Sequence, residues 1–167
     1  MKKFAEYFLN ESSEDVWTLL VRSTATDLYK FQNENDLEFD VYPLMKECYV
    51  VCDSNALQRI RDNFNIISEH HGDFVPEKKH YEFSVKMKKD YLHPYRSKRL
   101  ETFFRDFKHY GLYSVHLQRT DSSEDHVMSY NLTMSAYDTR ENVLGYLRSA
   151  LKKGFEREDL TLENTNK

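Results

Sequence analysis

The residues of this chain that could do chemistry are concentrated in one basic segment, residues 78–109. It carries ten of the 24 lysines and arginines but only four of the 28 acidic residues. Residues 1–77 hold seven basic and fifteen acidic residues, and residues 110–167 hold seven and nine, so the three segments have net charges of −8, +6 and −2. Clustered lysine and arginine side chains attract phosphate groups or acidic protein surfaces. The segment therefore predicts a binding site for nucleic acid or for an acidic protein partner.

The candidate binding residues are the cations between positions 86 and 108 and the aromatic side chains of a short turn among them. Tyrosine and histidine rings beside cations can stack on the bases of a single strand while the cations neutralise phosphates. The candidates are Lys86, Lys88, Lys89, Tyr91, His93, Tyr95, Arg96, Lys98, Arg99, Arg105 and Lys108. The alternative interpretation is an ordinary solvated surface whose cations balance the acidic N-terminal region.

The histidines offer a second kind of chemistry, general acid and base catalysis. His80 and His116 would be suited to it if they were neighbours on a sheet, but the sequence shows no nucleophile or carboxylate constellation beside them. His70 and His71 precede Gly72 and fit the capping of a helix end. The sequence therefore favours a protein that is not an enzyme.

The two cysteines and the remaining motifs predict no metal ion and no cofactor. Cys48 and Cys52 lie four residues apart on a predicted strand, about 13 Å from each other, which is too far for a disulfide. Their default interpretation is a pair of buried apolar thiols. The sequence lacks the spacings of zinc sites, nucleotide-binding loops and common hydrolases.

The basic segment must be positioned by a strand and a helix. Residues 81–87 alternate between apolar and polar side chains, which is the period of a half-buried strand. Apolar side chains at positions 100, 103, 104 and 107 predict an amphipathic helix. Ser97 is its predicted N-cap, and Gly111 is predicted to follow its last turn.

Further elements are expected on both sides of this segment. Residues 113–118 and 128–136 alternate and predict an antiparallel hairpin, which is followed by a helix from Asp138 or Thr139 to Gly154. Upstream, residues 38–42 and 47–52 predict two strands. Two helices are also predicted there, one from Ser12 through Leu28 and one from Ser54 or Asn55 to Gly72.

This order of elements, in which no internal repeat is evident, predicts an α+β two-layer sandwich with helices on one face of an antiparallel or mixed sheet. A ferredoxin-like arrangement is one topology that fits. We expect a single domain over residues 1–155, with residues 1–45 as an N-terminal helical and strand extension packed on it. Residues 156–167 are expected to be a flexible charged tail.

The predicted strands leave a second, polar face of the sheet. That face would present His80, Glu82, Ser84, Lys86, Lys88, Ser114, His116, Gln118, Ser129, Asn131, Thr133 and Ser135. Antiparallel sheets commonly leave one face in water. The face is therefore either plain solvated surface, a platform for a ligand, partner or RNA, or a surface covered by the N-terminal elements.

Together these features predict a small cytoplasmic regulatory protein that binds nucleic acid or a nucleoprotein machine through a basic strand-turn-helix patch. The alternative is a protein-binding inhibitor or adaptor that docks on an acidic partner surface. The N-terminus does not resemble a signal peptide, and the sequence lacks an apolar run long enough to span a membrane, so no membrane partner is expected.

Overall fold

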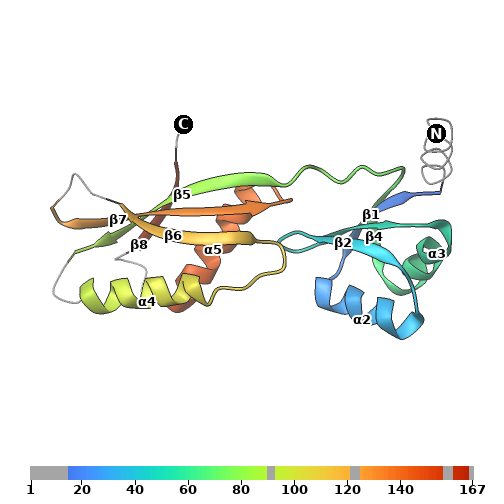
Figure 1. The fold of residues 1–167 in the computed structure, drawn as a ribbon, viewed down its shortest axis with the longest axis horizontal. Helices are drawn as coiled ribbons and strands as arrows, with labels where there is room; N and C mark the ends of the chain where they lie inside the picture. The colour runs from blue at the N-terminus through green and yellow to red at the C-terminus, as the bar shows by residue number, and fades with distance from the viewer. Residues whose placement is uncertain (1–14, 90–92, 121–124, 156–159, 166–167) are drawn as a thin grey trace, which may run out of the picture. The chain divides into compact units, whose positions relative to one another are not determined.

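The structure is a computed structural model that describes residues 15–89, 93–120, 125–155 and 160–165 (Figure 1). It contains two antiparallel four-stranded sheets with helices packed on them, which confirms the predicted α+β sandwich. The contacts divide the chain into two compact units, unit 1 (Met1–Glu77) and unit 2 (Lys78–Lys167).

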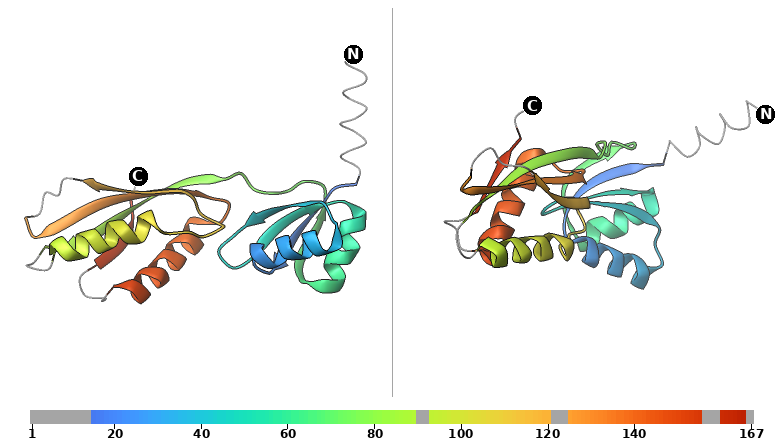
Figure 2. Two further views of the ribbon diagram at one scale, coloured as in Figure 1. Left: turned by 60° about the horizontal axis from the view of Figure 1, so that its bottom comes forward. Right: turned by 60° about the vertical axis from the view of Figure 1, so that its left-hand side comes forward.

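Unit 1 has the element order β-α-β-β-α-β. Its elements are β1 (Trp17–Arg22), α2 (Ala25–Asn35), β2 (Phe39–Pro43), β3 (Cys48–Cys52), α3 (Ser54–Asn63) and β4 (Asn65–His71). The strands pair antiparallel in the order β2-β3-β1-β4. Both helices lie on the same face of this sheet (Figure 2). The two predicted strands before residue 53 are confirmed as β2 and β3.

The predicted helix from Ser12 through Leu28 is wrong over the part that the structure describes. Trp17–Arg22 is the strand β1, and the helix α2 begins only at Ala25, where the Thr24 side chain accepts a hydrogen bond from the Asp27 amide at 3.1 Å. A short apolar run satisfies both helical and strand patterns, so periodicity alone does not separate them. Residues 17–22 form a strand because they pair with β3 on one side and with β4 on the other.

The predicted helix from Ser54 to Gly72 is also too long. Asp53 caps α3 by accepting from the Ala56 amide at 2.9 Å, and the helix ends at Asn63 because Phe64 is extended. The residues that follow form β4, which completes the sheet beside β1. Gly72 follows this strand with φ of +107°, so its left-handed backbone serves the turn that leaves the sheet.

The core of unit 1 joins the inward side chains of the strands to the two helices. Its fully or nearly fully buried residues include Leu19, Val21, Leu28, Val50, Leu57 and Ile60. Because side chains alternate along a strand, the intervening residues of β1 and β3 lie on the outer face of the sheet. That face carries the half-buried side chains of Leu20, Tyr49 and Val51, with Leu20 opposite Tyr49.

Unit 2 repeats the same element order. Its elements are β5 (Lys79–Lys88), α4 (His93–Arg105), β6 (Tyr113–Thr120), β7 (Val127–Ala136), α5 (Arg140–Gly154) and β8 (Leu160–Asn164). The strands pair antiparallel in the order β6-β7-β5-β8, and the helices again share one face (Figure 2). The predicted strand over residues 81–87, the hairpin and the last helix are confirmed, with Thr139 as the N-cap of α5.

Helix α4 is confirmed, but its predicted ends are wrong. It begins at His93 rather than after Ser97, and Ser97 lies inside the helix, where its hydroxyl is 2.6 Å from that of Tyr130. It ends at Arg105, six residues before Gly111. The chain turns there because the His109 ring accepts a hydrogen bond from the Gly111 amide at 2.9 Å.

The charged tail contains an unexpected strand. Residues 156–167 were predicted to be flexible, yet β8 pairs with Phe83–Met87 of β5, and Leu162 is buried opposite Val85. Strand β5 would otherwise be an edge with unpaired backbone groups, and β8 satisfies part of that edge. The remaining tail residues, 156–159 and 166–167, lie outside the described part of the chain.

The topology of both units is ferredoxin-like, because the first and third strands are central and the second and fourth are at the edges. The sequence gives no sign of a repeat, but the fold is present twice. The expected single domain over residues 1–155 also differs from the observed division. Strand β1, expected in an extension over residues 1–45, is instead a central strand of unit 1, and each unit forms a complete sheet from its own strands.

Candidate nucleic-acid interface

The reversal of charge along the sequence coincides with the boundary between the units. Unit 1 has a net charge of −8, whereas unit 2 holds seventeen basic and thirteen acidic residues and has a net charge of +4. An anionic partner is therefore attracted to unit 2 and repelled by unit 1. All of the candidate binding residues belong to unit 2.

Two of the candidate lysines lie on the outer face of the unit 2 sheet. Because Val85 and Met87 are buried under the helices, Lys86 and Lys88 point to the opposite face. Lys86 is opposite Ser129 on one side and Thr161 on the other. The face around them is polar as predicted, and next to Lys86 lies the row formed by Gln118, Asn131, Ser84 and Glu163.

Three other candidates gather on the helix side of the same unit. Tyr95, Lys98 and Arg99 lie on one face of α4 and line a groove of about 560 Å³. The remaining lining residues are Thr102 and Phe103 of α4 and Gly154 and Phe155 at the end of α5. Tyr95 is 72% exposed. The groove thus combines an exposed ring, two cations and an apolar wall.

Arg99 is held in place by the end of α5. Its Nη2 atom donates a hydrogen bond to the Gly154 carbonyl oxygen at 2.6 Å, and its guanidinium lies 5.0 Å from the centre of the Phe155 ring. A cation at a helix C-terminus is favourable because the last carbonyl groups carry partial negative charge. Arg99 therefore joins α4 to α5 as well as lining the groove.

The other candidates are more scattered. Arg105 is at the end of α4 beside Asp106, with 3.3 Å between Nε and Oδ1, and Lys108 is exposed beyond the helix. The backbone of Lys89 donates to the His126 carbonyl oxygen at 2.7 Å, and Arg96 is half-buried on α4. Tyr91 and the side chain of His93 lie outside the described part of the chain.

The sheet of unit 2 therefore divides the predicted patch between two surfaces. Lys86 and Lys88 are on the outer face, whereas Tyr95, Lys98 and Arg99 are on the helix side. The alternation of β5 and the packing of α4 on its buried face impose this division. Among the described residues, the groove on α4 is where candidate aromatic and basic side chains meet.

The histidines are not arranged as the sequence suggested. His80 and His116 lie on β5 and β6 with β7 between them, so their strands are about 10 Å apart. The His80 Nε2 atom is 3.8 Å from Glu82 Oε1. His70 and His71 are on strand β4 rather than at a helix end, and the His71 ring lies 4.8 Å from that of Trp17.

The cysteines are buried in unit 1, as predicted. Burial raises the pKa of the Cys48 thiol to about 11 and that of Cys52 to about 12, with a further rise at Cys52 from the nearby charge of Asp53. Both therefore stay protonated at neutral pH and are poor nucleophiles. Among the described residues, no group of three or more possible ligands could hold a metal ion.

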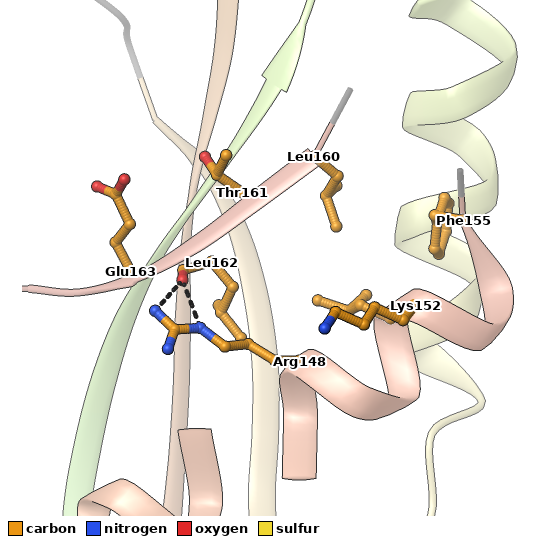
Figure 3. A pocket seen from close by; sticks show the side chains of 8 residues that line it. Arg148, Lys152, Phe155, Leu160, Thr161, Leu162 and Glu163 are labelled. Carbon is orange, nitrogen blue, oxygen red and sulfur yellow. Dashed lines mark hydrogen bonds between the residues drawn. The ribbon is translucent and has the colours of Figure 1, made fainter. Parts of the chain in front are cut away.

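A second hollow lies on the other side of Phe155, between α5 and β8 (Figure 3). It has a volume of about 310 Å³. Arg148 donates from Nε and Nη2 to the Leu162 carbonyl oxygen at 3.2 and 3.0 Å, which fastens β8 to the helix. This hollow also contains Lys152, but Glu163 lines it as well, whereas the lining of the groove on α4 contains no acidic residue. The groove on α4 is therefore the better site for an anion.

The groove contains residues that sequence reasoning assigned elsewhere. Phe103 belongs to the apolar stripe of α4, but it is half-buried, and its ring lies 5.8 Å from that of Phe155. Gly154 was identified only as the end of a helix. The available signal was the spacing of Tyr95, Lys98, Arg99 and Thr102, which places them on one side of a helix.

Comparisons with known proteins add no function to this geometry. No protein-family model matches the chain, and no curated protein matches it. The chain is similar to a solved structure titled as the crystal structure of an unknown protein from Galdieria sulphuraria, with 11% sequence identity and a TM-score of 0.25. The similarity covers 90% of this chain and 97% of that chain. A score this low carries no argument about fold or function.

The helices give one further observation. None of those described by the structure is long and apolar enough to cross a membrane.

Proposed function

We propose that this chain is an intracellular, non-catalytic regulatory protein whose unit 2 binds single-stranded nucleic acid, either free or within a nucleoprotein machine. The observation that carries the proposal is the groove on α4, where the exposed ring of Tyr95 lies on the same helix face as Lys98. Rings that stack on bases and cations that neutralise phosphates are the usual means of binding single strands.

The charge of the two units supports this choice of site. The net charge of +4 on unit 2 draws a polyanion to that unit, and the charge of −8 on unit 1 keeps it away from the rest of the chain. Around Lys86, the outer sheet face of unit 2 presents hydroxyl, amide and charged groups instead of the stacking aromatics of an RRM platform. Lys86 and Lys88 on that face could contact the phosphate backbone of a nucleic acid but could not stack on its bases.

The test is the binding of fluorescently labelled single-stranded RNA and DNA to the full chain, measured by fluorescence anisotropy at several salt concentrations. We expect affinity to fall steeply as salt rises, because neutralised phosphates release counterions. Two double variants with equal changes of charge then locate the site. Lys98→Glu/Arg105→Glu changes the helix side, and Lys86→Glu/Lys88→Glu changes the sheet face.

The helix-side variant should weaken binding at least about tenfold more than the sheet-face variant, because only the helix side combines cations with an exposed ring. Circular dichroism of both variants checks that the fold is retained. If both oligonucleotides fail to bind at low salt, the proposal is wrong. If the sheet-face variant has the larger effect, the site is misplaced.

A second candidate function is a protein-binding inhibitor or adaptor that docks on an acidic partner surface. The outer face of the unit 2 sheet favours it, because Lys86 lies among hydroxyl and amide groups that can bind carboxylates. The ratio of absorbance at 260 and 280 nm, measured before and after a high-salt wash of the purified protein, separates the two functions. Co-purified nucleic acid supports the first function, and one stoichiometric protein that survives nuclease treatment supports the second.

A further inference from the structure

The groove on α4 has a regular construction. Tyr95, Lys98, Arg99 and Thr102 occupy one face of the helix, and Phe103 follows on the neighbouring turn. The opposite wall is the end of α5, with Gly154 and Phe155. The volume of about 560 Å³ is within the range that small-molecule sites occupy.

The apolar wall is built from flat groups that contact one another. The rings of Phe103 and Phe155 are in edge-to-face contact, with their centres 5.8 Å apart and their planes at 80°. The guanidinium of Arg99 lies over the Phe155 ring and is fixed by the Gly154 carbonyl oxygen. Flat groups held in place before binding favour a flat ligand, because less side-chain entropy is lost when it stacks on them.

The charges of the groove are unevenly placed. Arg99 is occupied by the end of α5, where its charge offsets the partial negative charge of the last carbonyl groups. Lys98 is exposed on the second turn of α4, where its ammonium group can contact an anion in the groove. A ligand that is flat at one end and anionic at the other fits this arrangement.

We propose that the groove binds one unpaired nucleotide, with its base against the wall of Phe103, Phe155 and Arg99, its outer side covered by Tyr95, and its phosphate beside Lys98. The proposal rests on the proposed function, since it specifies what the α4 side of unit 2 recognises. It adds that the base itself is bound, whereas the proposed function requires only that a single strand is bound. An acidic peptide is the competing ligand, because it offers the anion without the base.

The experiment compares three anionic probes of equal length on the full chain. They are a labelled ten-nucleotide oligothymidine, the same sugar-phosphate backbone without bases, and a polyglutamate. Base stacking on an aromatic side chain contributes a factor of roughly 5 to 150 per base. We therefore expect the oligothymidine to bind at least about fivefold more tightly than the abasic backbone.

Tyr95→Ala should reduce this preference for bases several-fold, because one of the stacking groups is lost, while leaving affinity for the abasic backbone unchanged. Lys98→Glu should weaken both nucleic-acid probes. The matched controls are Tyr110→Ala, which removes another exposed ring of unit 2, and Lys79→Glu, which reverses an exposed cation at the start of β5. Neither control should alter the preference for bases.

The outcomes separate this inference from the proposed function. If oligothymidine and the abasic backbone bind with equal affinity, the inference is wrong while nucleic-acid binding stands. The same holds if Tyr95→Ala changes the affinity for neither probe. If polyglutamate binds as tightly as oligothymidine, the groove does not recognise a base. If no nucleic-acid probe binds, both the inference and the proposed function are wrong.

Discussion

Unit 1 and unit 2 share one ferredoxin-like topology but differ in the face of the sheet that their helices leave uncovered. In unit 1 that face carries half-buried apolar side chains, with Leu20 opposite Tyr49. In unit 2 the matching face carries Ser84 opposite Asn131 and Lys86 opposite Ser129. The net charges are opposite as well. The same topology therefore presents two different surfaces, and function depends on the side chains that each unit displays.

The largest expected effect tests whether the two units unfold independently. Trp17 is the only tryptophan and lies in unit 1, so its fluorescence reports on that unit alone. Phe83→Ala removes a fully buried ring of unit 2 and should cost about 3–5 kcal/mol of its stability. In urea titrations, circular dichroism should show an earlier transition while the fluorescence midpoint stays in place.

The matched variant is Ile60→Ala in unit 1, where the side chain is also fully buried. It should move the fluorescence midpoint to lower urea, with a cost of about 2–5 kcal/mol. If fluorescence and circular dichroism move together in both variants, the two units unfold as one and the comparison fails.

Alkaline pH should weaken unit 1 before unit 2. Cys48 and Cys52 both belong to unit 1, and their folded pKa values of about 11 and 12 exceed the ordinary value of 9.0 because burial disfavours the thiolate. The unfolded chain loses these protons first, so their stabilising contribution is full below pH 9 and is lost as pH rises toward 11 and 12. From pH 8 to pH 10 we expect unit 1 to lose about 2 kcal/mol.

The measurement is the urea midpoint of Trp17 fluorescence at pH 8 and pH 10. A Cys48→Ala/Cys52→Ala variant should be less stable at pH 8 but should lack most of the further loss. Burial also raises the pKa of Tyr81 in unit 2, so the comparison stays at or below pH 10. An equal alkaline loss in the variant would show that other groups cause the effect.

The same substitution, glycine to alanine, should have opposite effects in the two units. Gly72 has φ of +107°, and a Cβ atom there would lie 3.0 Å from the Phe74 ring. Gly72→Ala should therefore destabilise unit 1 by about 1–2 kcal/mol. Gly145 is an exposed residue inside α5 with open space around its Cα, so Gly145→Ala should stabilise unit 2 by about 0.5–1 kcal/mol.

Thermal and urea denaturation of both glycine variants, followed by fluorescence and circular dichroism, checks these signs. The prediction is contradicted if both variants shift the unfolding transition of the same unit. It is also contradicted if Gly72→Ala leaves the free energy of unfolding of unit 1 unchanged.

The smallest expected effect concerns the helix caps. Asp53 accepts from the Ala56 amide at the start of α3, and Thr139 accepts from the Asn142 amide at the start of α5. These helices hold equivalent positions in the two units. Asp53→Ala and Thr139→Ala should each cost about 1 kcal/mol, the first seen by Trp17 fluorescence and the second only by circular dichroism. Equal effects on both probes would contradict separate units.

The sequence predicts unit 2 better than unit 1 because its strands have two different faces. In β5 and β7 every second residue is polar, so the period of the strand is visible. Strands β1 and β3 carry apolar residues on both faces, which hides the period and allowed β1 to be read as part of a helix. Strand β8 was missed because only Leu160 and Leu162 interrupt a charged tail.

The candidate site was predicted in its residues but not in its geometry. The alternation of β5 is visible in the sequence, and it places Lys86 on the face away from the helices. The groove, however, depends on Phe155 and Gly154 meeting α4, and Gly154 is 55 positions from Arg99 along the chain. A contact of this kind depends on tertiary packing, which a local pattern does not contain.

Each unit is one continuous stretch of the chain, so unit 1 is synthesised completely before unit 2 begins. Every strand of the first sheet has left the ribosome well before the chain reaches β7, whereas β5 must wait for β8, near residue 160, to cover its second edge. At roughly 5–20 residues per second, that wait is on the order of 4–16 seconds. Unit 1 can therefore fold first, and unit 2 acquires its last strand only after β8 has been synthesised.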